Sequence, residues 1–95
     1  MASSVCVYLL RCADDSLYCG WTNDMERRLK SHNSGKASRY TSRRLPVRLV
    51  YARELPDRSA AMCEEARIKR LSRTQKLALI RDAPMIPRSL RGLIG

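Results

Sequence analysis

The sequence predicts an α+β domain built on a small sheet, in the order β-β-α-β-α-α. Two runs rich in apolar and β-branched residues come first and are separated by the turn-forming stretch ADDS. Segments with helical spacing and capping signals follow, with a third apolar run between the first two of them. A chain of 95 residues is long enough for one such domain. We expect it over residues 1–82, with residues 83–95 as a C-terminal tail.

The expected sheet begins with residues 5–12 (VCVYLLRC), which are apolar and β-branched enough for a buried strand. Residues 17–22 (LYCGWT) are expected to return as the second strand of a hairpin. Gly20 within this strand indicates either a bulge or a close approach of the backbone. Residues 47–54 (VRLVYARE) form the third expected strand.

The first helix is expected over about residues 24–34. Asn23, three residues before a glutamate, is a typical N-cap, and Gly35 ends the helical pattern. The next stretch, residues 36–46, is polar, basic and irregular. It therefore predicts a loop, with Tyr40 as its only aromatic residue.

Two further helices are predicted after the third strand. Asp57 is the expected cap of a helix that continues to about residue 71. Residues 72–75 (SRTQ) form a capping-box pattern for a third helix, which ends before Pro84. The prolines and weak periodicity of the C-terminal tail predict either a packed strap or a disordered end.

The chain is strongly basic: 19 Lys and Arg residues stand against 9 Asp and Glu residues, for a formal net charge of +10. Between residues 27 and 48 it carries eight cations and no anion. Because such a concentration repels itself in the folded state, it indicates a polyanionic partner, most simply nucleic acid, and salt-dependent binding. A merely solvated basic face is the alternative. The eight cations are Arg27, Arg28, Lys30, Lys36, Arg39, Arg43, Arg44 and Arg48.

The four cysteines form no C-x-x-C pair and have no histidine at metal spacing, which argues against a zinc site. Cys6, Cys12, Cys19 and Cys63 are expected as small core residues in a reducing compartment. The N-terminus has no basic segment before its apolar run, and that run is too short for a signal peptide or a membrane span. We therefore expect a soluble, cytoplasmic protein with no membrane partner.

Four residues that could carry chemistry gather near the first hairpin and the helix after it. Tyr8 and Tyr18 lie on the two strands of the hairpin, so their side chains can face a common side. Arg28 and His32 are four residues apart on the helix and are therefore neighbours on one of its faces. The alternative is a packing role, which is the more common one for strand tyrosines and for a lone helical histidine.

One carboxylate on the second helix has an unusual position. Ala61, Glu65 and Ile68 are spaced i, i+4 and i+7, a mostly apolar stripe that faces the core. An acid there costs desolvation free energy unless a cation or a metal meets it. Helical phase therefore favours Glu65 over the neighbouring Glu64 as a functional group.

In order and spacing, these residues resemble the GIY-YIG nuclease superfamily, and in particular its small stand-alone members. Residues 6–8 (CVY) stand where that family has GIY, and residues 18–20 (YCG) where it has YIG. Cys6 thus replaces the first glycine and Cys19 replaces the isoleucine. Both exchanges are apolar and lie outside the polar set.

The resemblance continues over roughly residues 5–80. Arg28 and His32 follow Gly20 by eight and twelve residues, as in the family pattern. Glu65 opens the stretch EARIK, which matches the family's E-x-x-I-K pattern. Each element alone is common, whereas all of them in order at matching spacing are specific.

The resemblance implies a three-stranded antiparallel sheet flanked by helices. It also implies metal-dependent endonuclease activity on the phosphodiester bonds of DNA, with a role in DNA repair or recombination. Glu65 would hold one Mg²⁺ or Mn²⁺, whose other ligands are water and phosphate oxygens, and Arg28 would stabilise charge on the phosphoryl group. The nucleic acid would contact Arg27, Lys36, Arg39, Tyr40, Arg43 and Arg44.

Tyr8 is the candidate general base. An unperturbed tyrosine has a pKa of about 10, so this role requires the surrounding cations to lower the pKa of Tyr8. Tyr18 would orient the attacking water or the phosphate. His32 and Tyr40 would assist by hydrogen bonding, and His32 is the alternative base. Trp21 is expected to pack against the core or to stack on an unpaired base.

The same basic stretch is compatible with a second function. The protein would then be a non-catalytic nucleic-acid-binding module that has kept the fold, or an accessory subunit that acts with a larger protein partner. The sequence leaves open whether the nucleic acid is double-stranded, single-stranded, branched or damaged, whether it is DNA or RNA, and which oligomeric state the protein adopts.

Overall fold

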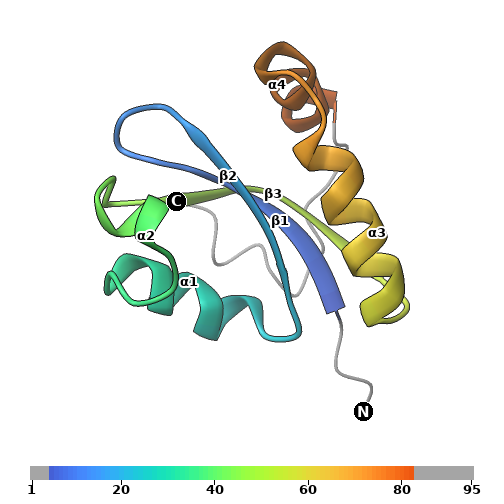
Figure 1. Ribbon diagram of the computed structural model, residues 1–95, viewed down its shortest axis with the longest axis horizontal. Coiled ribbons are helices and arrows are strands. Elements are labelled where there is room, and N and C mark those ends of the chain that lie inside the picture. The colour runs from blue at the N-terminus through green and yellow to red at the C-terminus, as the bar shows by residue number, and fades with distance from the viewer. Residues whose placement is uncertain (1–4, 83–95) are drawn as a thin grey trace.

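Three antiparallel strands form the centre of the computed structural model, which describes residues 5–82 (Figure 1). β1 (Val5–Arg11) lies in the middle, between β2 (Leu17–Thr22) and β3 (Arg48–Leu55). The predicted α+β class with a three-stranded antiparallel sheet is therefore confirmed. The tail expected over residues 83–95 lies outside the described residues.

Four helices flank the sheet in the described part of the chain. α1 (Met25–Asn33) and α2 (Arg39–Ser42) lie together on one side, and α3 (Arg58–Lys69) and α4 (Arg73–Asp82) lie on the other (Figure 1). None of these four helices is long and apolar enough to cross a membrane. The observed order is β-β-α-α-β-α-α, so the prediction had one helix too few.

The additional helix, α2, is a single turn inside the segment that was predicted as a loop. Ser38 caps it by accepting a hydrogen bond from the Thr41 backbone N–H (3.2 Å). A four-residue helix is too short to show apolar periodicity, so only the Ser38 cap could have indicated it.

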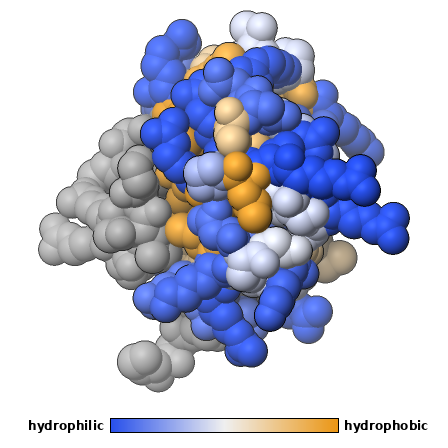
Figure 2. Space-filling model, turned by 90° about the vertical axis from the view of Figure 1, so that its left-hand side faces the viewer, coloured by the Kyte–Doolittle hydropathy of each residue, from blue (hydrophilic) through white to orange (hydrophobic). Residues whose placement is uncertain are grey.

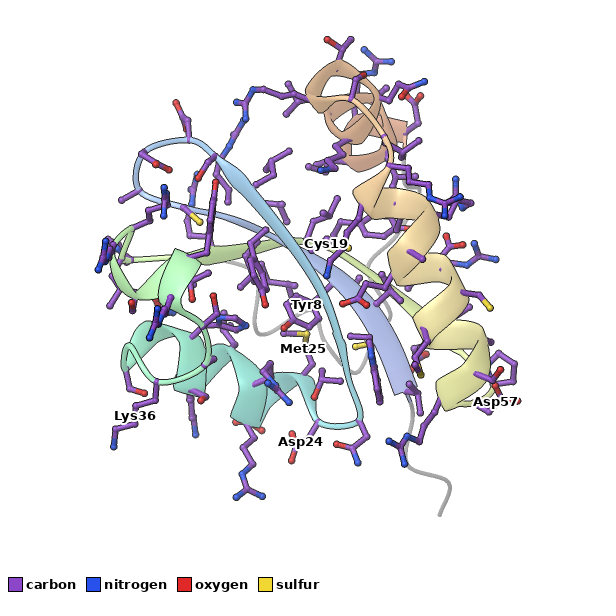
Figure 3. All side chains as sticks on the ribbon, in the orientation of Figure 1. Tyr8, Cys19, Asp24, Met25, Lys36 and Asp57 are labelled. Carbon is purple, nitrogen blue, oxygen red and sulfur yellow. The ribbon has the colours of Figure 1, made fainter. Side chains whose placement is uncertain are left out.

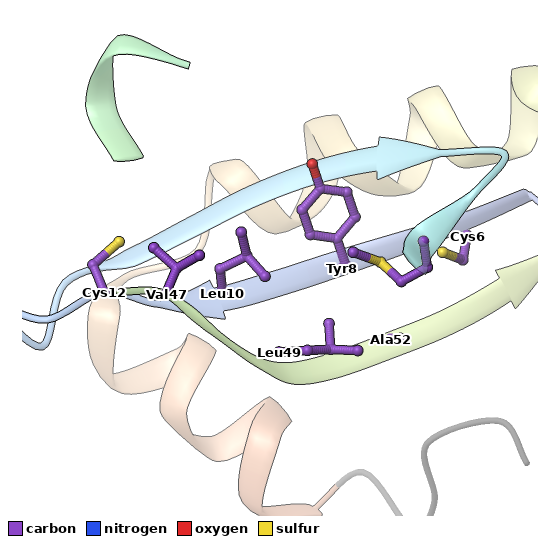
Figure 4. Packing of buried hydrophobic residues seen from close by; sticks show 8 residues of the cluster. Cys6, Tyr8, Leu10, Cys12, Val47, Leu49 and Ala52 are labelled. Carbon is purple, nitrogen blue, oxygen red and sulfur yellow. The ribbon is translucent and has the colours of Figure 1, made fainter. Parts of the chain in front are cut away.

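Side chains of β1 alternate between two cores, one on each face of the sheet. Tyr8 packs with Leu10 and Leu49 on one face (Figure 4), in a core that also contains Met25 of α1. Leu9 belongs to the opposite face and packs with Ile68 of α3. α1 and α3 therefore cover opposite faces, and β2 is the edge strand that lies between them.

The helix boundaries agree with the predictions at all but one of the positions where a cap or stop was predicted. Asp57 accepts a hydrogen bond from the α3 N-terminus (2.8 Å), and Gly35 ends α1 with a φ of 80°. The predicted cap Asn23 is wrong, because Asp24 caps α1 by accepting from the Arg27 backbone N–H (3.2 Å). Asn and Asp cap helices equally well, so adjacent Asn and Asp residues leave the start of a helix undecided by one position.

The predicted start of the last helix and the predicted bounds of the third strand can also be compared with the structure. Ser72 and Gln75 exchange hydrogen bonds of 2.9 and 3.1 Å between side chain and backbone, which confirms the capping box before α4. The third strand is shifted by one residue, since it spans Arg48–Leu55 rather than residues 47–54.

The cysteines are all free thiols, as predicted. Cys6, Cys12 and Cys19 are buried in the core, whereas Cys63 is exposed on α3. The expectation of a core position is therefore wrong for Cys63, which lies on the solvent side of its helix.

Candidate active site

A pocket of about 490 Å³ opens at the β2 edge of the sheet, between α1 and α3. Its lining includes Tyr8 from β1, Tyr18 and Gly20 from β2, Arg28 from α1 and Glu65 from α3. Figure 3 shows Tyr8 next to β2, in the space between α1 and α3. The predicted tyrosines, arginine and glutamate are thus brought together in one place.

Gly20 is the β2 residue directly opposite Tyr8 in the sheet. A Cβ atom at position 20 would stand 2.6 Å from the Tyr8 hydroxyl oxygen and 2.8 Å from its Cζ. These distances are far below van der Waals contact, so a side chain at position 20 would displace the phenol. The sequence predicted a bulge or a close backbone approach here, and the structure shows the Tyr8 ring lying over the glycine.

A chain of three buried polar side chains starts at the hydroxyl of Tyr8. A hydrogen bond of 2.9 Å joins Tyr8 Oη to His32 Nε2, and one of 2.8 Å joins His32 Nδ1 to Thr41 Oγ1. His32 is 1% exposed, and its ring also packs edge-on against Tyr18 at 5.0 Å between centroids. His32 therefore lies behind the two tyrosines, where it contacts the pocket only through them.

The environment of Tyr8 contradicts one sequence-based expectation. Burial raises the pKa of Tyr8 far above its ordinary value, the neighbouring Tyr18 adds to the rise, and Arg28 opposes it only in part. The same burial, together with Arg28, lowers the pKa of His32 to about 4. The cations therefore do not prepare a tyrosinate: at neutral pH, Tyr8 is a phenol hydrogen-bonded to a neutral imidazole.

His32 is expected to make the protein less stable as the pH falls from about 6.5 to about 4. The pKa of His32 is about 4 in the folded protein, against an ordinary value of 6.5. In this window the unfolded chain binds a proton that the folded chain does not, so folding stability is present above pH 6.5 and is lost on acidification. The loss reaches about 3 kcal/mol at pH 4.

Urea unfolding at pH 7 and at pH 4 measures this effect. Wild-type protein should lose more unfolding free energy between the two pH values than the His32→Gln variant, which has no imidazole to protonate. Equal losses in the two proteins would show that His32 does not titrate as its burial implies.

Glu64 and Glu65 are adjacent on α3, but their side chains have different neighbours. Glu64 forms ion pairs with Arg53 (3.2 Å) and Arg67 (2.6 Å), and hydrogen bonds from Arg67 lower its pKa. Glu65 lines the pocket and forms an ion pair with Lys69 at 3.4 Å. The preference for Glu65 that helical phase suggested therefore agrees with its position in the structure.

Arg58 is a lining residue that was not singled out from the sequence. It comes from the first turn of α3, and its guanidinium lies over the ring of Trp21, 5.5 Å from the centroid. Trp21 packs with the α3 face of the core and also lines the pocket. The available signal was the spacing of Arg58 and Glu65, which are seven residues apart and so share one face of a helix.

Part of the predicted basic stretch is already engaged within the protein. Arg44 forms an ion pair with Asp14 (3.0 Å), and Lys30 pairs with Glu26 (3.7 Å). The absence of an anion between residues 27 and 48 therefore does not leave these two cations unpaired, because Asp14 and Glu26 lie outside that stretch.

The other six cations of the stretch are exposed and form no ion pair within residues 5–82. Arg28 lines the pocket and Arg48 lies on β3. We call the remaining four the basic surface: Arg27, Lys36, Arg39 and Arg43.

The face that carries α1, α2 and the β1–β2 turn is largely hydrophilic (Figure 2). Tyr40 of α2 lies at the surface with its ring 6.1 Å from that of Tyr18, and the Arg44 guanidinium covers it at 3.8 Å. Tyr40 does not line the pocket. The structure thus places it beside Tyr18 as a stacked ring, away from the hydrogen-bonding position expected for it.

The pocket offers few protein ligands for a divalent ion, so water and substrate would have to complete its coordination. Glu65 is its one carboxylate, and no group of three or more His, Cys, Asp or Glu side chains within residues 5–82 is placed to ligate an ion. Mg²⁺ typically uses one or two carboxylates and fills its other positions with water and phosphate oxygens. The residues present fit a hydrated ion that the substrate helps to bind.

The fold and the pocket together define a small α+β domain in which tyrosine, arginine and glutamate side chains converge at one edge of a three-stranded sheet. Residues 4–78 match the family model described as the GIY-YIG catalytic domain, and the chain belongs to this family. Members of the family are nucleases that generally depend on a metal, so the expected resemblance is confirmed.

Relatives of similar length support the assignment. A UPF0213 protein of Clostridium perfringens is 50% identical over 74 residues, which cover 78% of this chain and 80% of its own. A UPF0213 protein of Streptococcus sanguinis is 46% identical over 82 residues, which cover 86% and 94%. The NMR structure of a UPF0213 protein from Bacillus halodurans is 44% identical, matches 82% of this chain and 83% of that one, and has a TM-score of 0.54.

Proposed function

We propose that this protein is a metal-dependent endonuclease that hydrolyses phosphodiester bonds in DNA, in the setting of DNA repair or recombination. The observation that carries the proposal is the convergence of Tyr8, Arg28 and Glu65, from three different elements, on one pocket. A phenol can transfer a proton, a guanidinium can stabilise phosphoryl charge and a carboxylate can hold a divalent ion. We place the activity in the cytoplasm, where free thiols such as that of Cys6 stay reduced.

Glu65 would hold the ion. When bound there, Mg²⁺ or Mn²⁺ would polarise the phosphate oxygens and stabilise charge on the departing oxygen. Arg28 would bind the phosphate from the α1 side of the pocket, and Arg58 is a second guanidinium on the α3 side. The two arginines would orient the phosphodiester between them.

Tyr8 would accept a proton from the attacking water while its own hydroxyl proton passes to His32 Nε2, 2.9 Å away. This transfer avoids a free tyrosinate, which the raised pKa of Tyr8 disfavours. The negative charge that develops on the phosphoryl group favours a cation on His32 at that moment. Tyr18, which packs on His32 and lines the pocket, would orient the water or the phosphate.

Purified protein incubated with labelled DNA tests the proposal. Double-stranded, single-stranded, branched and damaged DNA, and RNA of matching sequence, are each incubated with Mg²⁺, with Mn²⁺ and with a chelator. We expect cleavage of at least one DNA substrate that requires the metal and stops with the chelator. Binding without cleavage of any substrate by any divalent metal would favour the non-catalytic binding module.

Neutralising the basic surface is expected to weaken DNA binding and its dependence on salt. The double variant Arg39→Gln/Arg43→Gln removes two exposed cations at the two ends of α2, which form no ion pair in the described part of the chain. The slope of log K against log [salt] should flatten by about one unit for each lost phosphate contact. Arg70→Gln, at the far end of α3, is the control and should leave the slope unchanged. An unaltered slope in the double variant would place the nucleic acid elsewhere.

A further inference from the structure

The single turn α2 has a link to the pocket that no sequence pattern indicated. Thr41 is 0% exposed, and its Oγ1 lies 2.8 Å from His32 Nδ1. The other ring nitrogen, Nε2, lies 2.9 Å from the hydroxyl oxygen of Tyr8. Thr41 therefore reaches the phenol through one imidazole, although it does not line the pocket itself.

The hydrogen bonds of Thr41 bear on which nitrogen of His32 carries the proton. A neutral imidazole has one N–H donor and one acceptor nitrogen. The Thr41 hydroxyl is placed to donate to the backbone carbonyl of Ser38 (3.4 Å), which leaves its oxygen to accept from Nδ1–H. Nε2 is then the acceptor for the Tyr8 hydroxyl. In this arrangement each of the three protons has an acceptor inside the protein.

The reversed arrangement leaves one proton without such an acceptor. If the Thr41 hydroxyl donated to Nδ1, Nε2–H would donate to Tyr8, and the hydroxyl proton of Tyr8 would have to point into the pocket. Tyr8 would then present its proton, rather than a lone pair, to an attacking water. Buried donors are almost always paired within the protein or with ordered water, which favours the first arrangement.

We infer that Thr41 is a positioning residue that fixes His32 as the Nδ1–H tautomer, so that Nε2 faces Tyr8 as a proton acceptor. Contacts to the β1–β2 turn hold Thr41 in place: Arg44 donates to the Asp14 carboxylate (3.0 Å), and the Ala13 backbone N–H donates to the Arg44 carbonyl (2.9 Å). The consequence for cleavage rests on the proposed function, whereas the tautomer itself does not.

The test is a measurement of the ring nitrogens of His32 by long-range proton–nitrogen NMR in tag-free protein at pH 7. His32 is the only histidine in the chain, so the imidazole signals need no assignment. We compare wild type with Thr41→Val, which keeps the shape of the side chain and removes the hydroxyl, and with Thr41→Ser, which keeps the hydroxyl. Backbone amide spectra of the three proteins check that the fold around α2 is retained.

The expected result is protonated Nδ1 in wild type and in Thr41→Ser, with a shift toward protonated Nε2 in Thr41→Val. Protonated Nε2 in wild type, or an unchanged tautomer in Thr41→Val, would overturn the inference. In single-turnover assays, Thr41→Val should slow the chemical step by about 10- to 100-fold, by analogy with the loss of a partner that orients a metal-bound histidine. Thr41→Ser should restore the rate. If wild-type protein cleaves no substrate, the proposed function fails, while the NMR spectra still decide the tautomer.

Discussion

Glu65→Gln is expected to abolish cleavage while DNA binding stays near that of the wild-type protein. Glutamine keeps the size of the side chain and its place in the pocket but removes the one carboxylate that lines it among residues 5–82. A metal contributes several kcal/mol of charge stabilisation in such reactions, so its loss should slow the chemical step by roughly 10³-fold or more. Single-turnover cleavage and a binding titration, both in Mg²⁺, measure the two effects.

Glu64→Gln is the matched control because the two residues are adjacent on α3. Glu64 pairs with Arg53 of β3 and with Arg67, and its side chain is 13% exposed. Its replacement should cost about 1–3 kcal/mol of unfolding free energy, because charged hydrogen bonds from Arg53 and Arg67 to a largely buried carboxylate are lost. It should leave cleavage nearly unchanged. If Glu64→Gln stopped cleavage and Glu65→Gln did not, the metal site would have been assigned to the wrong side of α3.

Tyr8→Phe is expected to slow the chemical step by roughly 10²- to 10⁴-fold, the range typical of a lost acid or base. The ring packing is retained, but the buried Nε2 of His32 loses its partner, which should cost about 1–3 kcal/mol of unfolding free energy. Because the proton passes on to His32, whose pKa is about 4, the single-turnover rate of wild type should fall as the pH drops below about 5 and be flat near neutral pH. The variant should lose this dependence on the protonation of His32. Tyr18→Phe should slow cleavage with a smaller change in the pH dependence.

Tyr51→Phe is the control for a buried phenol that lies outside the pocket. Tyr51 is 5% exposed and packs in the core on the opposite face of the sheet, with α3. Its replacement should leave the rate and its pH dependence as in wild type. Cleavage by Tyr8→Phe at the wild-type rate would make Tyr8 a packing residue, and a base other than Tyr8 would then have to be sought.

Local signals predicted the elements of this fold well. The strands and the caps at Asp57 and Ser72 depend on residues a few positions apart, so one sequence suffices to find them. The start of α1 was missed by one residue because Asn23 and Asp24 are equivalent caps. The single turn α2 was missed because four residues carry no periodicity.

The residues of the candidate site could be predicted from the sequence, but their pKa values and ion pairs could not. Spacing singled out Tyr8, Arg28 and Glu65 on their separate elements, and the resemblance to the GIY-YIG family implied that they share one site. The pKa of Tyr8 could not be inferred in this way, since burial in the core between the sheet and α1 outweighs the nearby Arg28. Charge counting along the chain likewise could not show that Arg44 is paired, because Asp14 is 30 residues away in sequence.

Thr41 and Arg58 were beyond prediction for a different reason. Thr41 acts through a contact between α2 and α1, and no spacing rule connects a loop residue to the histidine that it touches. Arg58 shares a helix face with Glu65, but that face could be placed against the pocket only after β2 and α3 were seen together.

The central claim is that one pocket holds both the metal and the tyrosine, and Mn²⁺ titration of ¹⁵N-labelled protein tests it most directly. Sub-stoichiometric Mn²⁺ broadens the amide signals near its site even when binding is weak. We predict the strongest broadening at Gly20, Arg28 and Glu65, and its loss in Glu65→Gln. Broadening centred on the β1–β2 turn at Asp14 and Asp15, or unchanged by Glu65→Gln, would contradict the claim.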